Sequence, residues 1–332
     1  MSSDSAGHVA RSTVVPESET VPRTRVRRLL RTVDGVAVDA LYEPGAAVRE
    51  GAEDGSGAPY GTPSVGPVFV IAHGFTGDLD RPHVRRVARV FARYGAVVTF
   101  SFRGHGASGG RSTVGDREVL DLAAAVAWAR GFGHARVVTV GFSMGGSVVL
   151  RHAALYRREG DAGGGDGAER SSGRVEAGAG AGAGSGSGPE AGSGAGSGAH
   201  TGAWADAVIS VSAPARWYYR GTAPMRRLHW LVMRPEGRLV GRYGFRTRIH
   251  HRDWDPVPLS PVAAAARIAP VPLLIVHGDR DAYFPLDHPR MLAAAAGDHG
   301  ELWLEPGMGH AENAAPGDLL DRMARWALAQ AG

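Results

Sequence analysis

The chain has 332 residues, with 37 basic and 33 acidic side chains, a formal net charge of +4 and a pI near 9.7. It contains neither cysteine nor lysine, which excludes disulfides, thiol nucleophiles, thiolate metal sites, P-loop lysines and Schiff-base chemistry. A hydrophobic content of 43 % is enough for a sizeable buried core. The charge excess is small and no basic aromatic module or zinc-finger spacing occurs, so we expect no nucleic-acid partner.

The first predicted segment, residues 1–24, is polar and rich in Ser, Thr and Glu, and we interpret it as a disordered tail. It lacks the apolar stretch of a secretory signal, and no part of the chain is apolar for long enough to span a bilayer. We therefore expect a soluble cytoplasmic protein without a transmembrane segment.

The part after the tail alternates between short apolar runs and helical patterns. Asp34–Gly35 predicts a hairpin turn between two strands, and the later apolar runs predict strands buried on both faces. The predicted strands are 68–72, 96–102, 137–142, 208–211, 271–276 and 302–304. The predicted helices are 80–94, 116–131, 145–158, 289–296 and 319–329. This alternation indicates an α/β domain, residues 25–330, with a largely parallel sheet.

One segment, residues 160–203, interrupts this pattern. It has few large apolar residues and consists mostly of Gly, Ala and Ser. This composition predicts a flexible, disordered insert within the domain, because glycine loses much backbone entropy when it is ordered.

A Gly-x-Ser-x-Gly pattern, Gly141 to Gly145, lies where a predicted strand meets the following helix. Such a turn forces a tight elbow that raises the serine hydroxyl above the sheet edge. The N-terminus of the following helix favours negative charge there. The sequence therefore predicts that Ser143 is a nucleophile.

Three further candidates also follow predicted strands. His310 is the expected general base, and Asp281 is preferred over Asp279 as the acid that orients it, because Asp279 is placed to hold the turn. The backbone N–H groups of Phe75 and Met144 are the candidate oxyanion hole. Because the carboxyl ends of parallel strands share one edge of a sheet, we expect these groups to converge there.

The order Ser143, Asp281, His310, with His73–Gly74 upstream, resembles the α/β-hydrolase superfamily. Residues 103–108, Arg-Gly-His-Gly-Ala-Ser, are similar to a signature of its monoacylglycerol-lipase and serine-aminopeptidase-like branches. The resemblance implies an eight-stranded, mostly parallel sheet with flanking helices and a lid insertion at residues 213–265. It also implies that the glycine-rich insert lies far from the catalytic edge.

The predicted lid is rich in arginine and aromatic residues. Trp217, Tyr218 and Trp230 are candidates for lining a substrate pocket, with the alternative that these aromatic residues form only the core of the lid. The pair His250–His251 lacks further ligands, so no metal site is predicted.

These features together predict a serine hydrolase that cleaves a small-molecule carboxylic ester, or an amide or thioester, without a cofactor. Two alternatives stay open at this stage. The same three residues can serve an acyltransferase or a cofactor-free haloperoxidase, and the fold can also serve as a non-catalytic binding scaffold.

Overall fold

The computed structural model describes residues 24–45, 66–158 and 202–330. The predicted tail and the predicted glycine-rich insert lie outside the described residues except at their C-terminal ends.

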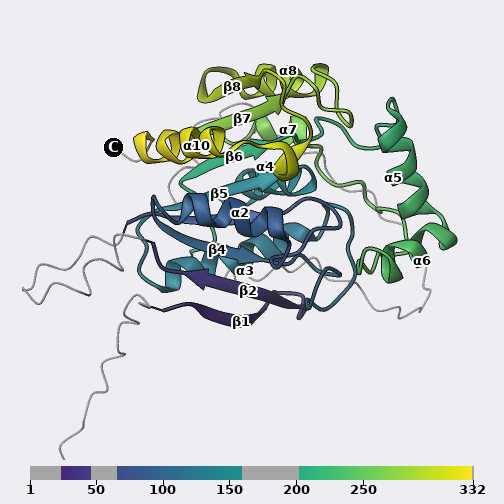
Figure 1. The fold of residues 1–332 in the computed structure, drawn as a ribbon, viewed down its shortest axis with the longest axis horizontal. Helices are drawn as coiled ribbons and strands as arrows, with labels where there is room; N and C mark the ends of the chain where they lie inside the picture. Colours follow the sequence, from purple (N-terminus) through teal and green to yellow (C-terminus); the bar gives the residue numbers. More distant parts are fainter. Residues whose placement is uncertain (1–23, 46–65, 159–201, 331–332) are drawn as a thin grey trace, which may run out of the picture.

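One eight-stranded sheet in the order β1-β2-β4-β3-β5-β6-β7-β8 forms the centre of the molecule (Figure 1). β1 and β2 form an antiparallel hairpin, β2 pairs antiparallel with β4, and all pairings from β4 through to β8 are parallel. The strands are β1 (Val26–Arg31), β2 (Ala37–Glu43), β3 (Val68–Ala72), β4 (Ala96–Phe100), β5 (Val137–Phe142), β6 (Ala207–Val211), β7 (Leu273–Gly278) and β8 (Gly300–Glu305). The predicted eight-stranded, mostly parallel sheet and the hairpin at Asp34–Gly35 are confirmed.

Helices cover both faces of the sheet, as connections between parallel strands require. On one face α3, α4, α7 and α8 pack against the first core cluster, and on the other α2, α9 and α10 pack against the second (Figure 1). Their bounds are α2 (Pro82–Phe91), α3 (Glu118–Gly131), α4 (Met144–Leu155), α7 (Pro261–Ala265), α8 (Asp287–Ala296), α9 (Ala311–Ala314) and α10 (Gly317–Ala329), with a 3-10 turn at Gly297–His299.

Alternating side chains of the parallel strands explain the two cores. In β3, Val68 and Val70 belong to the cluster under α3 and α4, whereas Phe69 and Ile71 belong to the cluster under α2 and α10. Successive side chains of a strand point to opposite faces, so a strand in the middle of the sheet needs apolar residues at every position. This is why the central strands are continuous apolar runs in the sequence.

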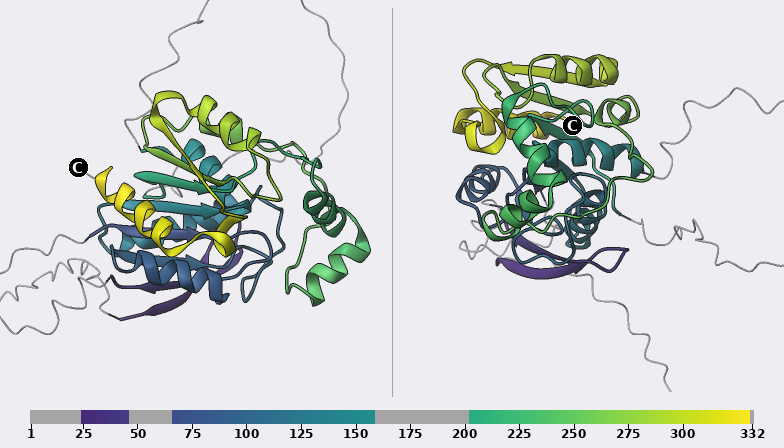
Figure 2. Two further views of the ribbon diagram at one scale, coloured as in Figure 1. Left: turned by 45° about the horizontal axis from the view of Figure 1, so that its top comes forward. Right: turned by 90° about the vertical axis from the view of Figure 1, so that its right-hand side faces the viewer.

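The predicted lid, residues 213–265, contains three helices that the sequence did not indicate. One is α7, at the end of this range, which packs against the first core cluster, and the other two are α5 (Ala223–Met233) and α6 (Pro235–Tyr243). Thr222 caps α5 by accepting a hydrogen bond from the Met225 N–H at 3.4 Å. Pro235 separates the helices, since it has no N–H to continue α5 but is well suited to begin a helix. The two helices lie beyond the carboxyl ends of the strands, away from the sheet (Figure 2).

No helix within the described ranges is long and apolar enough to cross a membrane.

Candidate active site

The loops that follow four parallel strands meet at one edge of the sheet. β3 leads into Phe75, β5 into Ser143, β7 into Asp281 and β8 into His310. The pairing registers set Ala72 beside Gly141 and Gly278 beside Glu305, so these strands end close to one another. The sheet itself therefore brings together groups that are up to 235 positions apart in the sequence.

Ser143 lies on the tight elbow between β5 and α4, with a left-handed backbone conformation at φ 52° and ψ −114°. The glycines on either side make this elbow possible. A Cβ atom at Gly141 would lie 2.2 Å from the Gly145 carbonyl oxygen, and one at Gly145 would lie 2.2 Å from the Ala72 carbonyl oxygen. Backbone approaches so closely here that only glycine fits, which leaves the serine side chain raised at the turn.

Ser143, His310 and Asp281 form a continuous chain of hydrogen bonds. The His310 Nε2 atom lies 2.8 Å from the Ser143 Oγ atom, and the His310 Nδ1 atom lies 2.8 Å from the Asp281 Oδ2 atom. The Asp281 side chain is 1 % exposed, whereas the His310 side chain is 17 % exposed. The carboxylate is thus shielded from water, while the imidazole stays partly accessible.

The second oxygen of Asp281 is held by the backbone. Its Oδ1 atom accepts hydrogen bonds from the N–H groups of Tyr283 at 2.8 Å and Phe284 at 3.1 Å. Burial by itself raises the pKa of Asp281, but the hydrogen bond to His310, the charges of His310 and His277 and the backbone donors outweigh it and hold that pKa below its usual value. Asp279 instead accepts the Gly307 N–H at 2.6 Å, so it ties the turn after β7 to the turn after β8.

The two candidate oxyanion donors both line the cavity in front of Ser143. Met144 is the first residue of α4, where an N–H has no acceptor inside the helix. Within the part of the chain that the structure describes, no acceptor is found for the Phe75 or the Met144 N–H. Both donors are therefore available to a ligand atom.

Three side chains hold the loop that carries Phe75. Glu312 accepts the Gly74 N–H at 2.9 Å, and His105 accepts the Thr76 N–H at 3.3 Å through its Nε2 atom. The His73 ring contacts the Gly74 carbonyl oxygen at 2.7 Å and accepts the Phe102 N–H at 3.0 Å. Burial lowers the pKa of His73 to about 3 and that of His105 to about 4, so both rings are neutral near pH 7.

Sequence reasoning did not find Glu312. It is a buried glutamate on α9, two residues after His310, and 238 positions away from the glycine that it holds. The only sequence signal is an acidic residue two positions after the predicted general base. The Glu312 side chain thus connects the loop of His310 with the loop of Phe75.

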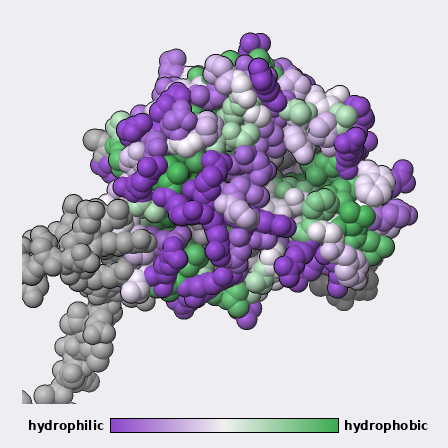
Figure 3. Space-filling view, viewed as in Figure 1, coloured by the Kyte–Doolittle hydropathy of each residue, from purple (hydrophilic) through white to green (hydrophobic). Residues whose placement is uncertain are grey.

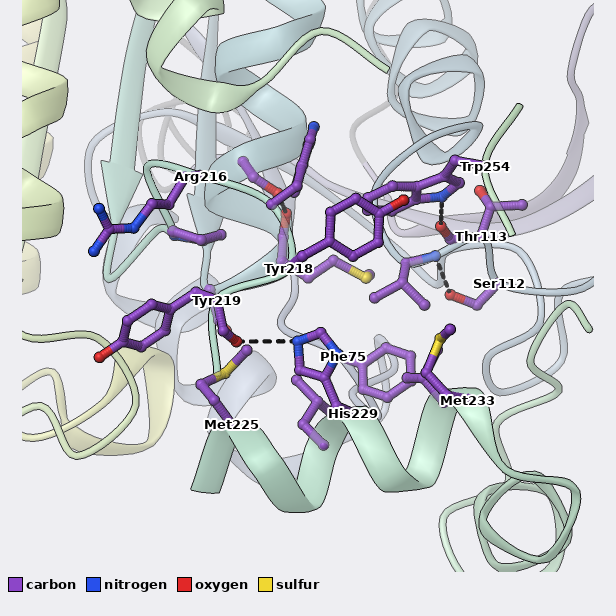
Figure 4. A pocket seen from close by; sticks show the side chains of 18 of the residues that line it. Phe75, Ser112, Thr113, Arg216, Tyr218, Tyr219, Met225, His229, Met233 and Trp254 are labelled. Carbon is purple, nitrogen blue, oxygen red and sulfur yellow. Dashed lines mark hydrogen bonds between the residues drawn. The ribbon is translucent and has the colours of Figure 1, made fainter. Parts of the chain in front are cut away.

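A largely apolar cavity opens in front of Ser143 (Figure 4). Two of the predicted aromatic residues line it, Trp217 and Tyr218, and both rings contact Trp254, with centroid distances of 5.0 and 5.4 Å. The Trp254 Nε1 atom donates to the Thr113 carbonyl oxygen at 2.7 Å, which ties the predicted lid to the loop after β4. The remaining apolar lining comes from Phe75, Val114, Met144, Pro214, Tyr219, Phe284 and α5.

Trp230 is not one of the lining residues, and here the structure corrects the expectation from the sequence. The α5 side chains that line the cavity include Leu228 and Val232. Trp230 is two positions away from both, so it points to the opposite side of the helix, where it is 48 % exposed. Helical geometry excludes it from the cavity wall.

No group of three or more His, Asp or Glu side chains among the described residues is arranged to hold a metal ion. The rings of His250 and His251 stack on each other with their centroids 5.1 Å apart. The site places a hydroxyl, an imidazole, a buried carboxylate and two backbone N–H donors beside an apolar cavity. These are the groups that nucleophilic attack on an acyl group requires.

Comparison with known proteins agrees with this architecture. Residues 69–322 match the model of a family described as the alpha/beta hydrolase family. No curated protein matches the sequence. Among solved structures, the esterase Pf2001 of Pyrococcus furiosus is similar with 18 % identity and a TM-score of 0.59, over 97 % of this chain and 96 % of that one.

Two other solved structures are similar at the same level. Est1E of Butyrivibrio proteoclasticus shares 16 % identity with a TM-score of 0.52, over 92 % of this chain and 98 % of its own. The alpha/beta hydrolase GrgF of Penicillium sp. sh18 shares 15 % identity with a TM-score of 0.57, over the same shares of the two chains. At such low identity these similarities establish the fold.

Proposed function

Because the chain belongs to the alpha/beta hydrolase family, we propose that it hydrolyses carboxylic esters through a covalent acyl-enzyme on Ser143. The observation that carries the proposal is the hydrogen-bonded chain from Ser143 through His310 to the buried Asp281, with 2.8 Å at each step. Esterases with a similar fold, such as the Pyrococcus furiosus protein, support the choice of an ester substrate.

In the first half of the reaction, the Ser143 Oγ atom attacks the ester carbonyl carbon while His310 takes the hydroxyl proton on Nε2. The carbonyl oxygen becomes an oxyanion, and the N–H groups of Phe75 and Met144 are the proposed donors to it. Collapse of this intermediate breaks the ester C–O bond, and the leaving alkoxide takes the proton from His310. The products are an acyl-Ser143 ester and a free alcohol.

In the second half, water attacks the acyl carbon and His310 accepts one of its protons. The tetrahedral intermediate then releases the carboxylic acid and returns the proton to Ser143. Asp281 remains ionised throughout, because its lowered pKa keeps it a carboxylate, and it stabilises the imidazolium that forms in each half.

The cavity points to an ester with an apolar acyl or alcohol group. Its walls are mostly aromatic and aliphatic side chains, and its polar groups lie chiefly next to Ser143 and at the lid. An apolar substrate group that binds there is removed from water, and no charged group has to be buried with it, which favours binding. Of the lining cations, Arg216 is already paired with Asp287 at 2.8 Å.

A fluorophosphonate probe and p-nitrophenyl butyrate hydrolysis test the proposal. We expect stoichiometric labelling of the wild-type protein, complete loss of labelling in Ser143→Ala, and a fall in kcat on the order of 10⁶-fold. Ser147→Ala is the matched control, since Ser147 also lines the cavity but donates its hydroxyl proton to the Met144 carbonyl oxygen. A folded wild-type protein that neither reacts with the probe nor hydrolyses esters would contradict the proposal and favour a binding scaffold.

A further inference from the structure

Most of the large hydrophobic side chains that are exposed to solvent lie in or near the two lid helices α5 and α6. Twelve large hydrophobic side chains are exposed among the described residues, and eight of them lie between positions 218 and 257. Tyr243 is 75 % exposed and Leu239 is 58 % exposed. Figure 3 shows apolar surface gathered at the end of the molecule where α5 and α6 lie. We call this surface, formed by Trp230, Met233, Leu239, Val240, Tyr243 and Phe245, the lid patch.

The packing of α6 explains why its apolar side chains are exposed. The helix approaches its neighbours through glycines, since a Cβ atom at Gly237 would lie 2.4 Å from the Trp230 carbonyl oxygen, and one at Gly241 would lie 2.9 Å from the Ile249 Cδ1 atom. The inner side of α6, which faces its neighbours, therefore presents backbone atoms and not side chains. Leu239 and Tyr243 are offset from these glycines by two residues each, and this spacing turns them to the outer side.

The lid also carries a strong positive charge. Residues 213–265 contain ten of the 37 basic side chains and three of the 33 acidic ones, so the lid has a net charge of +7 and the rest of the chain −3. Among the described residues, Arg216 is the one lid arginine in an ion pair. None of the other nine forms an ion pair with a carboxylate of the described residues.

We propose that the lid patch binds the surface of an anionic lipid membrane. Exposed aromatic and aliphatic side chains insert into the headgroup region of a bilayer, and surrounding arginines are attracted to anionic lipids. The helix pair projects from the body of the molecule, which lets it reach a flat surface (Figure 2). A second copy of the chain is a poor partner, because two lids of +7 repel each other.

Vesicle co-sedimentation of the full chain tests this proposal independently of any esterase activity. We expect binding to vesicles of equal parts phosphatidylcholine and phosphatidylglycerol, and at least tenfold weaker binding to pure phosphatidylcholine. Raising the salt from about 0.1 M to about 1 M should weaken the binding at least tenfold, since the Debye length falls from about 10 Å to about 3 Å. The paired change Leu239→Ser and Tyr243→Ser should reduce binding to anionic vesicles by at least tenfold.

Charge variants and matched controls complete the test. Arg242→Glu with Arg246→Glu should weaken anionic binding to a similar degree. Leu29→Ser and Arg28→Glu should leave it unchanged, because both residues are exposed on β1, an edge strand of the sheet that lies away from α5 and α6 (Figure 1). None of these residues lines the cavity, so hydrolysis of a water-soluble ester should not change in any variant. Lack of binding, equal binding by the lid variants, or a concentration-dependent dimer that the Leu239 and Tyr243 changes abolish would each overturn the proposal.

Discussion

Asparagine in place of Asp281 separates the orienting role of this carboxylate from its role in the fold. The side chains are nearly equal in size, so the buried site can accept the change without a cavity. The amide, however, has one acceptor and one donor end, whereas the carboxylate has two acceptor oxygens. Its orientation therefore decides what happens to His310.

The backbone determines that orientation. The N–H groups of Tyr283 and Phe284 both point at the Asp281 Oδ1 atom, at 2.8 and 3.1 Å, and require an acceptor there. The amide oxygen of asparagine takes that position, so its NH₂ group lies against the His310 Nδ1 atom, which is 2.8 Å from the carboxylate in the wild type. Nδ1 must then be an acceptor, and the ring proton moves to Nε2. That tautomer cannot accept the proton of Ser143.

We expect Asp281→Asn to lower kcat for p-nitrophenyl butyrate by about 10³- to 10⁴-fold, the loss observed when the tautomer of a catalytic histidine is reversed. KM should change by less than about threefold, because Asp281 does not line the cavity. Steady-state kinetics with circular dichroism as a fold check measures both values. ¹⁵N NMR of the imidazole reports the tautomer directly.

Asp279→Asn is the matched control. Asp279 holds the Gly307 N–H at 2.6 Å and does not contact His310, so asparagine can keep that bond with its amide oxygen. We expect less than about threefold loss of kcat. A loss of less than about tenfold for Asp281→Asn, or a larger loss for Asp279→Asn than for Asp281→Asn, would show that the assignment of the acid is wrong.

Three further changes test other parts of the structure. Gly145→Ala should abolish activity or soluble expression, because its Cβ atom would meet the Ala72 carbonyl oxygen, whereas Gly131→Ala has open space at its Cβ atom and should be neutral or slightly stabilising by thermal unfolding. Glu312→Leu leaves the buried Gly74 N–H without an acceptor and should lower kcat about tenfold or more with little change in KM, while Glu312→Gln should retain most of the rate. Four buried histidines have pKa values lowered by burial to about 3 or 4, so below about pH 6.5 the unfolded chain binds more protons than the folded one. The free energy of unfolding should then fall by up to about 1.4 kcal/mol per pH unit for each histidine. Urea midpoints should fall with it, and midpoints that stay level down to pH 5 would refute this. These histidines are His73, His105, His152 and His288.

The sheet could be predicted because its signals are local. Each central strand is a short apolar run, and the structure places β3 and β5 at the predicted positions 68–72 and 137–142. Helix ends were less accurate. The predicted helix 80–94 begins at Pro82 and ends at Phe91, since a proline favours the first helical turn and apolar residues continue into the turn that follows. Topology then places the strand ends at one edge, so the meeting of Ser143 and His310 needed no information beyond the order of the elements.

The supporting contacts of the site could not be predicted in this way. Glu312 and Gly74 are far apart in the sequence, and their contact depends on how α9 turns after His310. The left-handed backbone of Ala311, at φ 55°, directs that turn, and alanine gives no sign of it because glycine is the residue usually found there. Contacts that depend on one unusual dihedral angle leave no pattern in a single sequence.

In the predicted lid, hydrophobic periodicity does not indicate which residues are buried in the core. Met225, Leu228 and Val232 have the spacing of a helix face that packs on a core, yet in the structure this face of α5 lines the cavity. Leu239 and Tyr243 have the same spacing on α6, and they are exposed because the inner side of that helix is glycine backbone. In a helix that belongs to the core, an apolar face indicates burial on folding. In a helix that stands beyond the sheet edge, the same face is available to a ligand or a surface, so the apolar residues of this lid are better predictors of what the protein binds than of how it folds.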